Sequence, residues 1–503
     1  MLFVNGKFYT GKGFSEAVFV KDGIIEEVGG TEALIKAHPN EEIVDLEKRL
    51  VIPGFNDSHI HVLSYSRFLE SVNLRGAESK EEIIALGKKA LENNNILVMY
   101  GCDDSFFPAP LTRSDLDLIS SEKPVIVHRS CGHIAFVNSS ALRLLPEGEA
   151  AGYIDPENGI LKEDAVSLLE KVFPKESPSR LKERIRRTMR NLNSLGITSL
   201  ATGDVAGDLE EGLRIVEAYR ELEEEGELSA RVSLKFAFID EEKIKAFWNR
   251  RSSSPYFRFG PLKLYLDGSL GGSTALLSEP YRPGYYGIQT LSCGKLQDLL
   301  EFSEANGIQV AAHAIGDEAC ALFLDAFKKT CKRNSRRHFL IHLQVLRKDL
   351  LAEMQALGIP ASLQPIFLEE DLKMAKRKLS QNLLKTSYAF RSIAALTVAA
   401  FSSDAPYGGV NPFRGLRAAL TQEDGDGEIL NPEERMGREE ALKAYTANSA
   451  YLTFEEKVKG RIAPGFFADF AALSDDYFSV PEREIAGLRA DVTVVGGKIV
   501  YRR

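Results

Sequence analysis

The chain has 503 residues, of which 44% are hydrophobic and 27% charged, so it has the composition of a globular protein and a length typical of roughly two to four domains at about 150 residues each. Its formal net charge of −9 argues against a dedicated nucleic-acid surface, which usually carries a basic patch. The five cysteines lack CxxC spacing, which argues against a cysteine zinc site. The sequence has neither a signal-peptide pattern nor an apolar run of about 20 residues. We therefore expect a cytoplasmic protein with no membrane or nucleic-acid partner.

Both ends of the chain are rich in short apolar segments that are separated by turn residues. Residues 2–4 and 17–20 are each followed by a hairpin signal, Asn-Gly in the first case and Asp-Gly in the second. Residues 469–501 repeat this pattern near the other end. We therefore expect residues 1–52 and 453–503 to form one small β-sandwich built from both termini.

Between the ends, short apolar strands alternate with long amphipathic helices, which is typical of parallel β/α architecture. Eight strands are predicted, at residues 51–58, 197–201, 232–237, 262–266, 308–312, 339–341, 361–364 and 398–402. Helical patterns separate most of them, for example at residues 178–195, 208–226, 317–332 and 346–357. This order predicts an α/β protein with a TIM-type (β/α)8 barrel.

The first two barrel strands are far apart in the sequence. The stretch between them, residues 76–165, contains strand candidates of its own at residues 96–100 and 124–127. We expect this stretch to be an inserted α/β subdomain over one face of the barrel. The barrel itself then consists of residues 53–75 and 166–452.

Two histidines stand at the end of the first predicted strand. Because side chains alternate along a strand, His59 and His61 point to the same side and can aim both imidazoles at one point. Imidazole is the commonest neutral ligand of divalent transition metals. Pro53 and Gly54, just before them, mark the entry into a new element.

Further metal-ligand residue types follow the other predicted strands. His313 follows the fifth strand, His342 the sixth and Asp404 the eighth, while Lys263 lies within the otherwise apolar fourth strand. In barrels of this type the active site lies at the carboxyl ends of the strands, where these side chains would converge. Four of the eight histidines occupy such positions, so the set predicts a metal centre far more strongly than any one member.

These residues and several phrases around them resemble a known family. Pro53-Gly54-Phe55 with Asp57, His59 and His61, followed by Lys263, His313, His342 and Asp404, is similar to the pattern of the amidohydrolase superfamily. Residues 132–139, 263–269, 313–317 and Gln364-Pro365 resemble one branch, amidohydrolase family 3, which includes N-substituted formamide deformylase-like proteins. The resemblance covers essentially the whole chain.

The resemblance implies a centre with one or two divalent metal ions. His59 and His61 would hold the more buried ion and His313 and His342 the other, while Asp404 would contact the metal-bound water. Zinc suits these ligands best, although iron, manganese or cobalt also fit histidine with carboxylate oxygens.

Two further roles are implied by the resemblance. Lys263 would be carboxylated by CO2 to a carbamate that bridges both ions, because a buried lysine has a lowered pKa and exposes the neutral amine that CO2 needs. The alternative is an ordinary salt-bridged lysine over a one-metal site. His133, in the insert, would reach over the barrel mouth to contact substrate or the developing oxyanion, unless it is a hydrogen-bonded loop histidine.

Other candidates have weaker support. Glu163 faces the site by resemblance, but a carboxylate favoured by the dipole of a helix start explains it equally well. Asp317 could orient His313, although the N-cap of the next helix is the favoured interpretation. The glycine-rich residues 268–274 lack the ending of a phosphate loop, so nucleotide binding is not expected.

The sequence therefore predicts a metal-dependent hydrolase that acts on a C–N bond of a small molecule, an amide or an N-acyl or N-formyl group. Asp404 and His133 are the predicted catalytic residues. Two alternatives remain: the same centre could deaminate a ring or open a cyclic amide, or the chain could be a non-catalytic metal-binding scaffold. The substrate and the oligomeric state are left open, and a homo-oligomer is compatible with the sequence.

Overall fold

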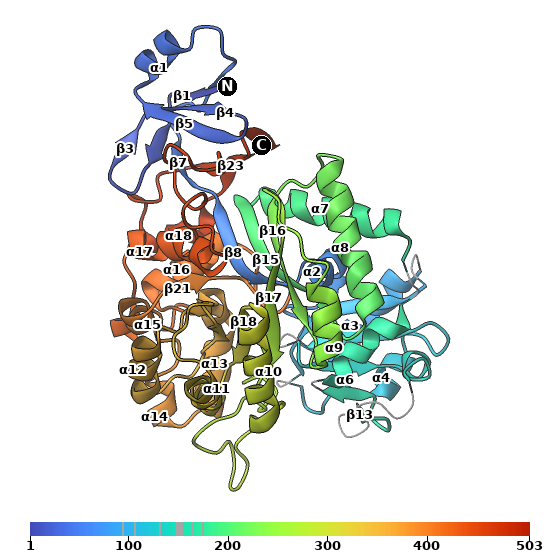
Figure 1. Ribbon diagram of the computed structural model, residues 1–503. Helices are drawn as coiled ribbons and strands as arrows, with labels where there is room; N and C mark the ends of the chain where they lie inside the picture. The colour runs from blue at the N-terminus through green and yellow to red at the C-terminus, as the bar shows by residue number, and fades with distance from the viewer. Residues whose placement is uncertain (93–94, 105–106, 130–131, 147–153, 163, 174–175) are drawn as a thin grey trace.

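The computed structural model describes all residues except 93–94, 105–106, 130–131, 147–153, 163 and 174–175. It is a mixed α/β structure with four sheets. Figure 1 shows the strands of both chain ends gathered at one end of the molecule, a barrel below them, and the segment before β15 beside the barrel. Within the described residues, no helix combines the length and apolar character needed to cross a membrane.

Eight parallel strands form the barrel, which confirms the predicted eight-stranded architecture. In their order around the barrel they are β8 (Phe55–Ile60), β15 (Ile197–Ala206), β16 (Arg231–Ala237), β17 (Phe257–Tyr265), β18 (Val310–Ala314), β19 (Phe339–His342), β20 (Ala361–Leu363) and β21 (Ala399–Phe401). Backbone hydrogen bonds from Asp404 N to His59 O (2.8 Å) and from His61 N to Ala405 O (3.0 Å) connect the last strand to the first. The ring is therefore nearly closed at the end where the predicted site residues lie.

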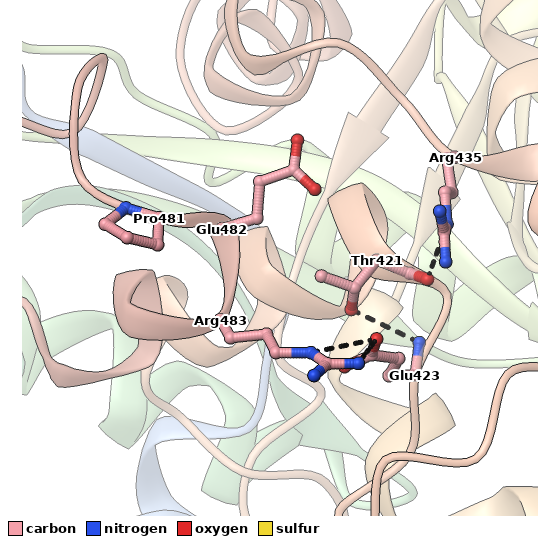
Figure 2. A pocket seen from close by; sticks show the side chains of 6 residues that line it. All are labelled: Thr421, Glu423, Arg435, Pro481, Glu482 and Arg483. Carbon is pink, nitrogen blue, oxygen red and sulfur yellow. Dashed lines mark hydrogen bonds and ion pairs between the residues drawn. The ribbon is translucent and has the colours of Figure 1, made fainter.

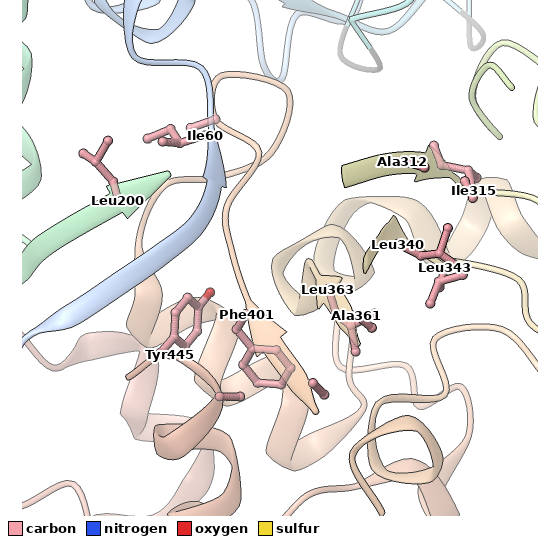
Figure 3. Packing of buried hydrophobic residues seen from close by; sticks show 14 of the residues in the cluster. Ile60, Leu200, Ala312, Ile315, Leu340, Leu343, Ala361, Leu363, Phe401 and Tyr445 are labelled. Atoms are coloured by element: carbon pink, nitrogen blue, oxygen red, sulfur yellow. The ribbon is translucent and has the colours of Figure 1, made fainter. Parts of the chain in front are cut away.

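Helices surround the barrel. They are α2 (Val62–Glu70), α7 (Pro178–Asn193), α8 (Leu209–Glu224), α9 (Glu241–Trp248), α10 (Cys293–Asn306), α11 (Asp317–Thr330), α12 (Lys348–Leu357), α13 (Leu368–Lys378), α14 (Gln381–Leu384), α15 (Phe390–Leu396), α16 (Pro412–Thr421), α17 (Arg438–Ala444) and α18 (Ala447–Leu452). Capping residues in the sequence fix where helices begin. Asp208, for example, accepts a hydrogen bond from the backbone N–H of Glu211 at the start of α8. Outward-facing strand residues pack on this layer, as Phe401 does edge-on against Tyr445 at 5.3 Å between ring centroids (Figure 3).

The first predicted strand, residues 51–58, is two strands in the structure. β7 (Leu50–Pro53) pairs with strands of the chain ends, whereas β8 belongs to the barrel. The break falls at Gly54, whose backbone N–H bonds to Asp469 O. A Cβ atom at Gly54 would lie 2.2 Å from two side-chain atoms of Thr198 on β15, so glycine is needed for this close approach.

Strands from the two chain ends share a six-stranded sheet, in the order β24 (Lys498–Arg502), β23 (Ala490–Val495), β22 (Phe470–Leu473), β7, β2 (Lys7–Tyr9), β3 (Phe14–Ser15). A second sheet has the order β5 (Ile24–Gly29), β4 (Ala17–Lys21), β1 (Leu2–Val4), β6 (Ile43–Asp45), with α1 (Thr31–Ala37) beside it. One apolar cluster contains residues of both sheets, including Phe3, Val18, Phe8 and Phe470. Burial of this shared face holds the two ends of the chain together.

The segment between the first two barrel strands forms a sheet of its own, in the order β13 (Ile154–Asp155), β14 (Ile160–Lys162), β12 (Ile134–Val137), β11 (Val125–Arg129), β10 (Leu97–Cys102), β9 (Val72–Asn73). Its helices are α3 (Lys80–Leu91), α4 (Arg113–Asp117), α5 (Ser139–Leu142) and α6 (Asp164–Ser167). The strand candidates at residues 96–100 and 124–127 thus correspond to β10 and β11. This segment has its own apolar cluster, around Leu97, Val125 and Phe136.

Candidate metal centre

His59, His61 and Asp404 lie together at the carboxyl ends of β8 and β21. His59 Nε2 is 3.1 Å and His61 Nε2 is 3.3 Å from the same oxygen, Asp404 Oδ1. The potential ligand atoms of these three residues all lie within 4.8 Å of one another. The structure thus brings His59 and Asp404, which are 345 positions apart in the sequence, next to each other as predicted.

The second pair of predicted ligands lies next to the first. The ring centroids of His313 and His342, at the ends of β18 and β19, are 4.5 Å apart, and His342 is 5.7 Å from His59. Lys263 extends from β17 into the same space, with Nζ 3.4 Å from His59 Nε2. All six predicted metal residues thus meet at one end of the barrel.

Hydrogen bonds on the far side of three rings fix which nitrogen faces the centre. His61 Nδ1 lies 3.2 Å from Gly203 O, and His313 Nδ1 lies 2.9 Å from Asp267 Oδ1. Because a carbonyl or carboxylate oxygen can only accept, the ring hydrogen is on Nδ1 in both cases. The lone pair of Nε2 is then left free to bind a cation.

His342 follows the same rule through Gln364, which sequence reasoning did not single out as a site residue. The amide nitrogen of Gln364 donates to Ser402 Oγ (2.7 Å), so its oxygen faces the His342 ring and accepts from Nδ1 at 2.8 Å. Gln364 directly follows β20. The sequence feature that could have identified Gln364 as a site residue is its position directly after a strand.

Asp267 is the second residue that the sequence reading missed. Its fully buried carboxylate accepts from His313 Nδ1 and from the backbone N–H groups of Leu276, Ile315 and Gly316, at 2.8–3.1 Å. Four donors on two oxygens leave the carboxylate no freedom to turn. The signal for Asp267 was its place just after β17.

Both interpretations of Asp317 are wrong. It is the first residue of α11, whose N-cap is Gly316, and its carboxylate bonds to Ser278 and to Arg347 Nη1 rather than to His313. Asp267 takes the orienting role instead, because the loop after β17 runs directly beside the His313 ring. The other weak candidate, Glu163, lies outside the described residues.

Burial disfavours the charged form of the groups at the centre. It lowers the pKa of His59 and His342 well below the usual value, and that of His313 as well. Burial also lowers the pKa of Lys263 to about 7. Neutral imidazoles are the form that binds metal ions.

The residues present fit a divalent cation. Two buried atoms at the centre, His313 Nε2 and Asp404 Oδ1, have no hydrogen-bond partner. Unpaired buried acceptors are costly unless a cation or water satisfies them. Imidazole nitrogens with a carboxylate oxygen are a donor set that suits zinc and its neighbours in the first transition series.

Two of the converging residues have unusual backbone geometry. His342 has a φ of 85° and Asp404 a φ of 55°, both in the left-handed region that favours glycine. Such a conformation costs an ordinary residue about 1–2 kcal/mol. It turns each side chain inward as its strand ends.

His133 also lies close to this group. Its ring centroid is 5.6 Å from that of His313. The approach depends on Gly132, which has a φ of 72° and whose added Cβ would lie 2.1 Å from the Tyr407 ring. Tyr407 in turn packs edge-on against His61, with ring centroids 5.4 Å apart. Gly132 and His133, just before β12, therefore lie against the mouth of the barrel.

A second cluster with metal-ligand residue types does not suit an ion. Glu304, Cys331 and His338 have ligand atoms within 4.8 Å of one another. However, His338 Nδ1 accepts from Val310 N (2.8 Å), so its hydrogen is on Nε2, which faces Glu304 Oε1 at 2.6 Å. Neither ring nitrogen has a lone pair to spare, so His338 has a structural role here.

An open cavity of about 410 Å³ lies elsewhere, and Figure 2 shows its lining. Arg483 forms hydrogen bonds with Glu423, and Arg435 donates to the backbone oxygen of Thr421. Arg483 and Glu423 thus satisfy each other, and none of the predicted site residues lines the cavity. The predicted site residues lie at the barrel mouth instead.

Comparison with known proteins agrees with this geometry. The sequence profile of the Amidohydrolase family matches residues 42–501. The chain is 31% identical to YtcJ of Bacillus subtilis strain 168, over 97% of this chain and 96% of that protein. It is 24% identical to an N-substituted formamide deformylase of Arthrobacter pascens, over 97% of this chain and 95% of that protein.

A solved structure gives the same result. The crystal structure of a metal-dependent hydrolase from Pyrococcus horikoshii OT3 matches with a TM-score of 0.81 and 28% identity, covering 96% of this chain and 99% of that one. The family profile and the relatives each span nearly the whole chain. The chain therefore belongs to amidohydrolase family 3 of the amidohydrolase superfamily.

Proposed function

We propose that this hydrolase cleaves a C–N bond of an amide, N-acyl or N-formyl compound at a divalent metal centre, with zinc as the ion that fits best. The observation that carries the proposal is the convergence of two histidine pairs, Lys263 and Asp404 at one end of the barrel. The relative named as an N-substituted formamide deformylase supports the choice of bond. Water and an amide would yield a carboxylic acid and an amine.

One or two bound ions would lower the pKa of a coordinated water toward about 7 and polarise the substrate carbonyl. His59, His61, His313 and His342 would hold them through Nε2. Asp404 would accept a proton from the attacking water and pass it to the leaving nitrogen, as general base and then general acid. His133 would donate to the developing oxyanion, which its position near His313 supports.

Lys263 is proposed to carry a carbamate. Its amine would add to CO2 and release one proton, which converts a cation into an anionic oxygen ligand. Complete burial and a pKa of about 7 support this reaction, because a large fraction of the amine is then neutral. Crystals grown with bicarbonate and metal should show density beyond Nζ, and density that ends at Nζ would refute the carbamate.

We further propose that the two sheets of the chain ends act as a β-sandwich, residues 1–52 with 453–503, and that residues 76–165 act as an inserted subdomain. The barrel would then comprise residues 53–75 and 166–452. The shared apolar cluster of the terminal sheets and the separate cluster around Leu97 support this division.

The proposal is tested by metal analysis and by Asp404→Asn. We expect stoichiometric metal in the native protein and a kcat lowered about 10²–10⁴-fold in the variant, because the amide cannot take up the proton. Asp426→Asn is the matched control, since Asp426 is an exposed carboxylate that pairs with Lys373. Turnover is measured on N-formyl, N-acyl, cyclic-amide and amino-substituted ring compounds.

Protein purified without stoichiometric metal, or an Asp404→Asn variant with undiminished turnover, would overturn the proposal. Turnover of only the cyclic or the amino-substituted compounds would instead support a cyclic-amide hydrolase or a deaminase. A protein that contains metal but turns over none of these compounds would support the alternative of a non-catalytic metal-binding scaffold.

A further inference from the structure

Three consecutive residues of β15 lie against the three consecutive residues with which α2 begins. Each residue of the first set accepts a hydrogen bond from one residue of the second: Thr202 Oγ1 from Val62 N at 3.0 Å, Gly203 O from His61 Nδ1 at 3.2 Å, and Asp204 Oδ1 from Leu63 N at 2.9 Å. The two segments are thus joined at three successive positions beside the candidate metal centre.

This is an unusual way to begin a helix. The first N–H groups of a helix have no partner inside it, and the N-cap side chain commonly supplies one, as Asp208 does for α8. His61 is the N-cap residue of α2, yet within the described residues its side chain makes no capping hydrogen bond. Because β15 supplies the acceptors instead, the contacts that complete α2 also fix where His61 stands relative to that strand.

An irregularity in β15 brings these acceptors into place. The register with β16 shifts between Thr202 and Val205, so that Gly203 and Asp204 stand opposite a single residue of β16. Such a bulge interrupts the ladder and re-aims the groups of the bulged residues. It accounts for a carbonyl and a carboxylate, from adjacent residues, that both face the start of α2.

The clamp also sets the room that the His61 ring has. A Cβ atom at Gly203 would lie 3.0 Å from His61 Cε1 and 3.2 Å from Nδ1, so a larger residue would press on the ring. Asp204 is itself held from behind, because the hydroxyl of Tyr219 on α8 donates to its Oδ2 at 2.8 Å. The ring therefore rests on a strand segment that is anchored to the outer helix layer.

We propose that Thr202, Gly203 and Asp204 position His61 as a metal ligand, a role that rests on the proposed metal-dependent function. Capping alone would need only the two side-chain acceptors, whereas the middle residue of the clamp contacts the imidazole itself. With Nδ1 engaged by Gly203 O, His61 Nε2 faces Asp404 Oδ1 at 3.3 Å. The three residues act through His61 and are positioning residues.

The test is zinc affinity, measured by competition with a chromophoric chelator. Asp204→Ala removes the acceptor of Leu63 N and should weaken zinc binding about 10- to 100-fold, as loss of an outer partner of a metal ligand does. Asp204→Asn keeps an acceptor oxygen for Leu63 N and should restore most of the affinity. Equal losses in the alanine and asparagine variants would show that the charge matters and the clamp does not.

Asp208→Ala is the matched control, because Asp208 accepts from Glu211 N at 2.8 Å at the start of a helix that carries no predicted ligand. It should lower the urea midpoint of the chelator-treated protein and leave zinc affinity unchanged. If Asp204→Ala and Asp208→Ala weaken zinc binding equally, general loosening explains both and the inference fails.

Gly203→Ala tests the contact with the ring directly. The added methyl group should displace the imidazole and weaken zinc binding, although it removes no hydrogen-bonding group. If Asp204→Ala does not fold, Thr202→Val replaces it, since valine has nearly the shape of threonine but cannot accept from Val62 N. Native-like zinc affinity in Gly203→Ala and in Thr202→Val would contradict the inference.

The outcomes separate this inference from the proposed function. Native protein that binds no zinc overturns both. Tight zinc binding in the native protein and in every clamp variant overturns only the positioning role of residues 202–204 and leaves the proposed metal centre standing.

Discussion

At the scale of single residues, the partners behind the histidines are as much a part of the centre as the histidines. Asp267 illustrates this best, because one carboxylate both orients the His313 ring and ties down two loops through backbone N–H groups. A ligand ring that is held in one tautomer and one orientation loses less freedom when it binds an ion.

We predict that Asp267→Asn lowers zinc affinity about 10- to 100-fold. An amide has one acceptor oxygen, so its NH2 group would face backbone N–H groups such as that of Gly316. Asp317→Asn is the control, because Asp317 bonds to Ser278 and Arg347 and not to His313. Equal zinc affinity in Asp267→Asn and the native protein, by chelator competition, would contradict the prediction.

The sequence predicted the residues that converge but not those that orient them. His59, His313 and Asp404 stand out because few residue types can bind metal and each follows a strand. Asp267 and Gln364 were missed because carboxylates and amides are common at strand ends, and only the path of the loops decides which ring each one meets.

At the scale of elements, Gly54 decides where one strand becomes two. The predicted strand 51–58 is continuous in hydrophobicity, so its division between two sheets could not be read from the pattern. The division depends on contacts with Thr198 and Asp469, which are distant in sequence.

We predict that Gly54→Ala lowers the free energy of unfolding by about 1–3 kcal/mol, because the added methyl group overlaps Thr198. The control is Gly294→Ala in the first turn of α10, where an added Cβ has no neighbour within 4 Å. That change should stabilise by up to about 1 kcal/mol. Urea denaturation measures the stability of both variants. An unchanged midpoint in Gly54→Ala would show that β8 and β15 can move apart at this position without loss of stability.

At the scale of the whole molecule, the barrel and the terminal strands are joined by a buried ion pair. Arg231 of β16 and Asp469, just before β22, are each almost fully buried and form two hydrogen bonds of 2.6 and 2.9 Å. The Arg231 guanidinium also stacks over the Phe467 ring, 3.6 Å from its centroid. The alternating strands and helices of the sequence predicted the barrel, whereas this junction depends on residues 238 positions apart.

We predict that Arg231→Met lowers the free energy of unfolding by about 3–5 kcal/mol, because Asp469 is left as a buried charge without its partner. Lys7→Met is the control, since the Lys7–Asp476 pair is partly exposed and should contribute less than about 1 kcal/mol. Guanidinium titration followed by circular dichroism measures both. Similar losses in the two variants would mean that burial adds nothing to the junction.

The left-handed backbones of His342 and Asp404 also bear on how the protein can change over generations. Glycine would relax either position, so a mutation there can stabilise the chain while it removes a side chain of the proposed metal centre. Selection for stability alone would favour glycine at both positions. If proteins that evolve from this chain keep both side chains, selection is acting on activity and not on stability alone.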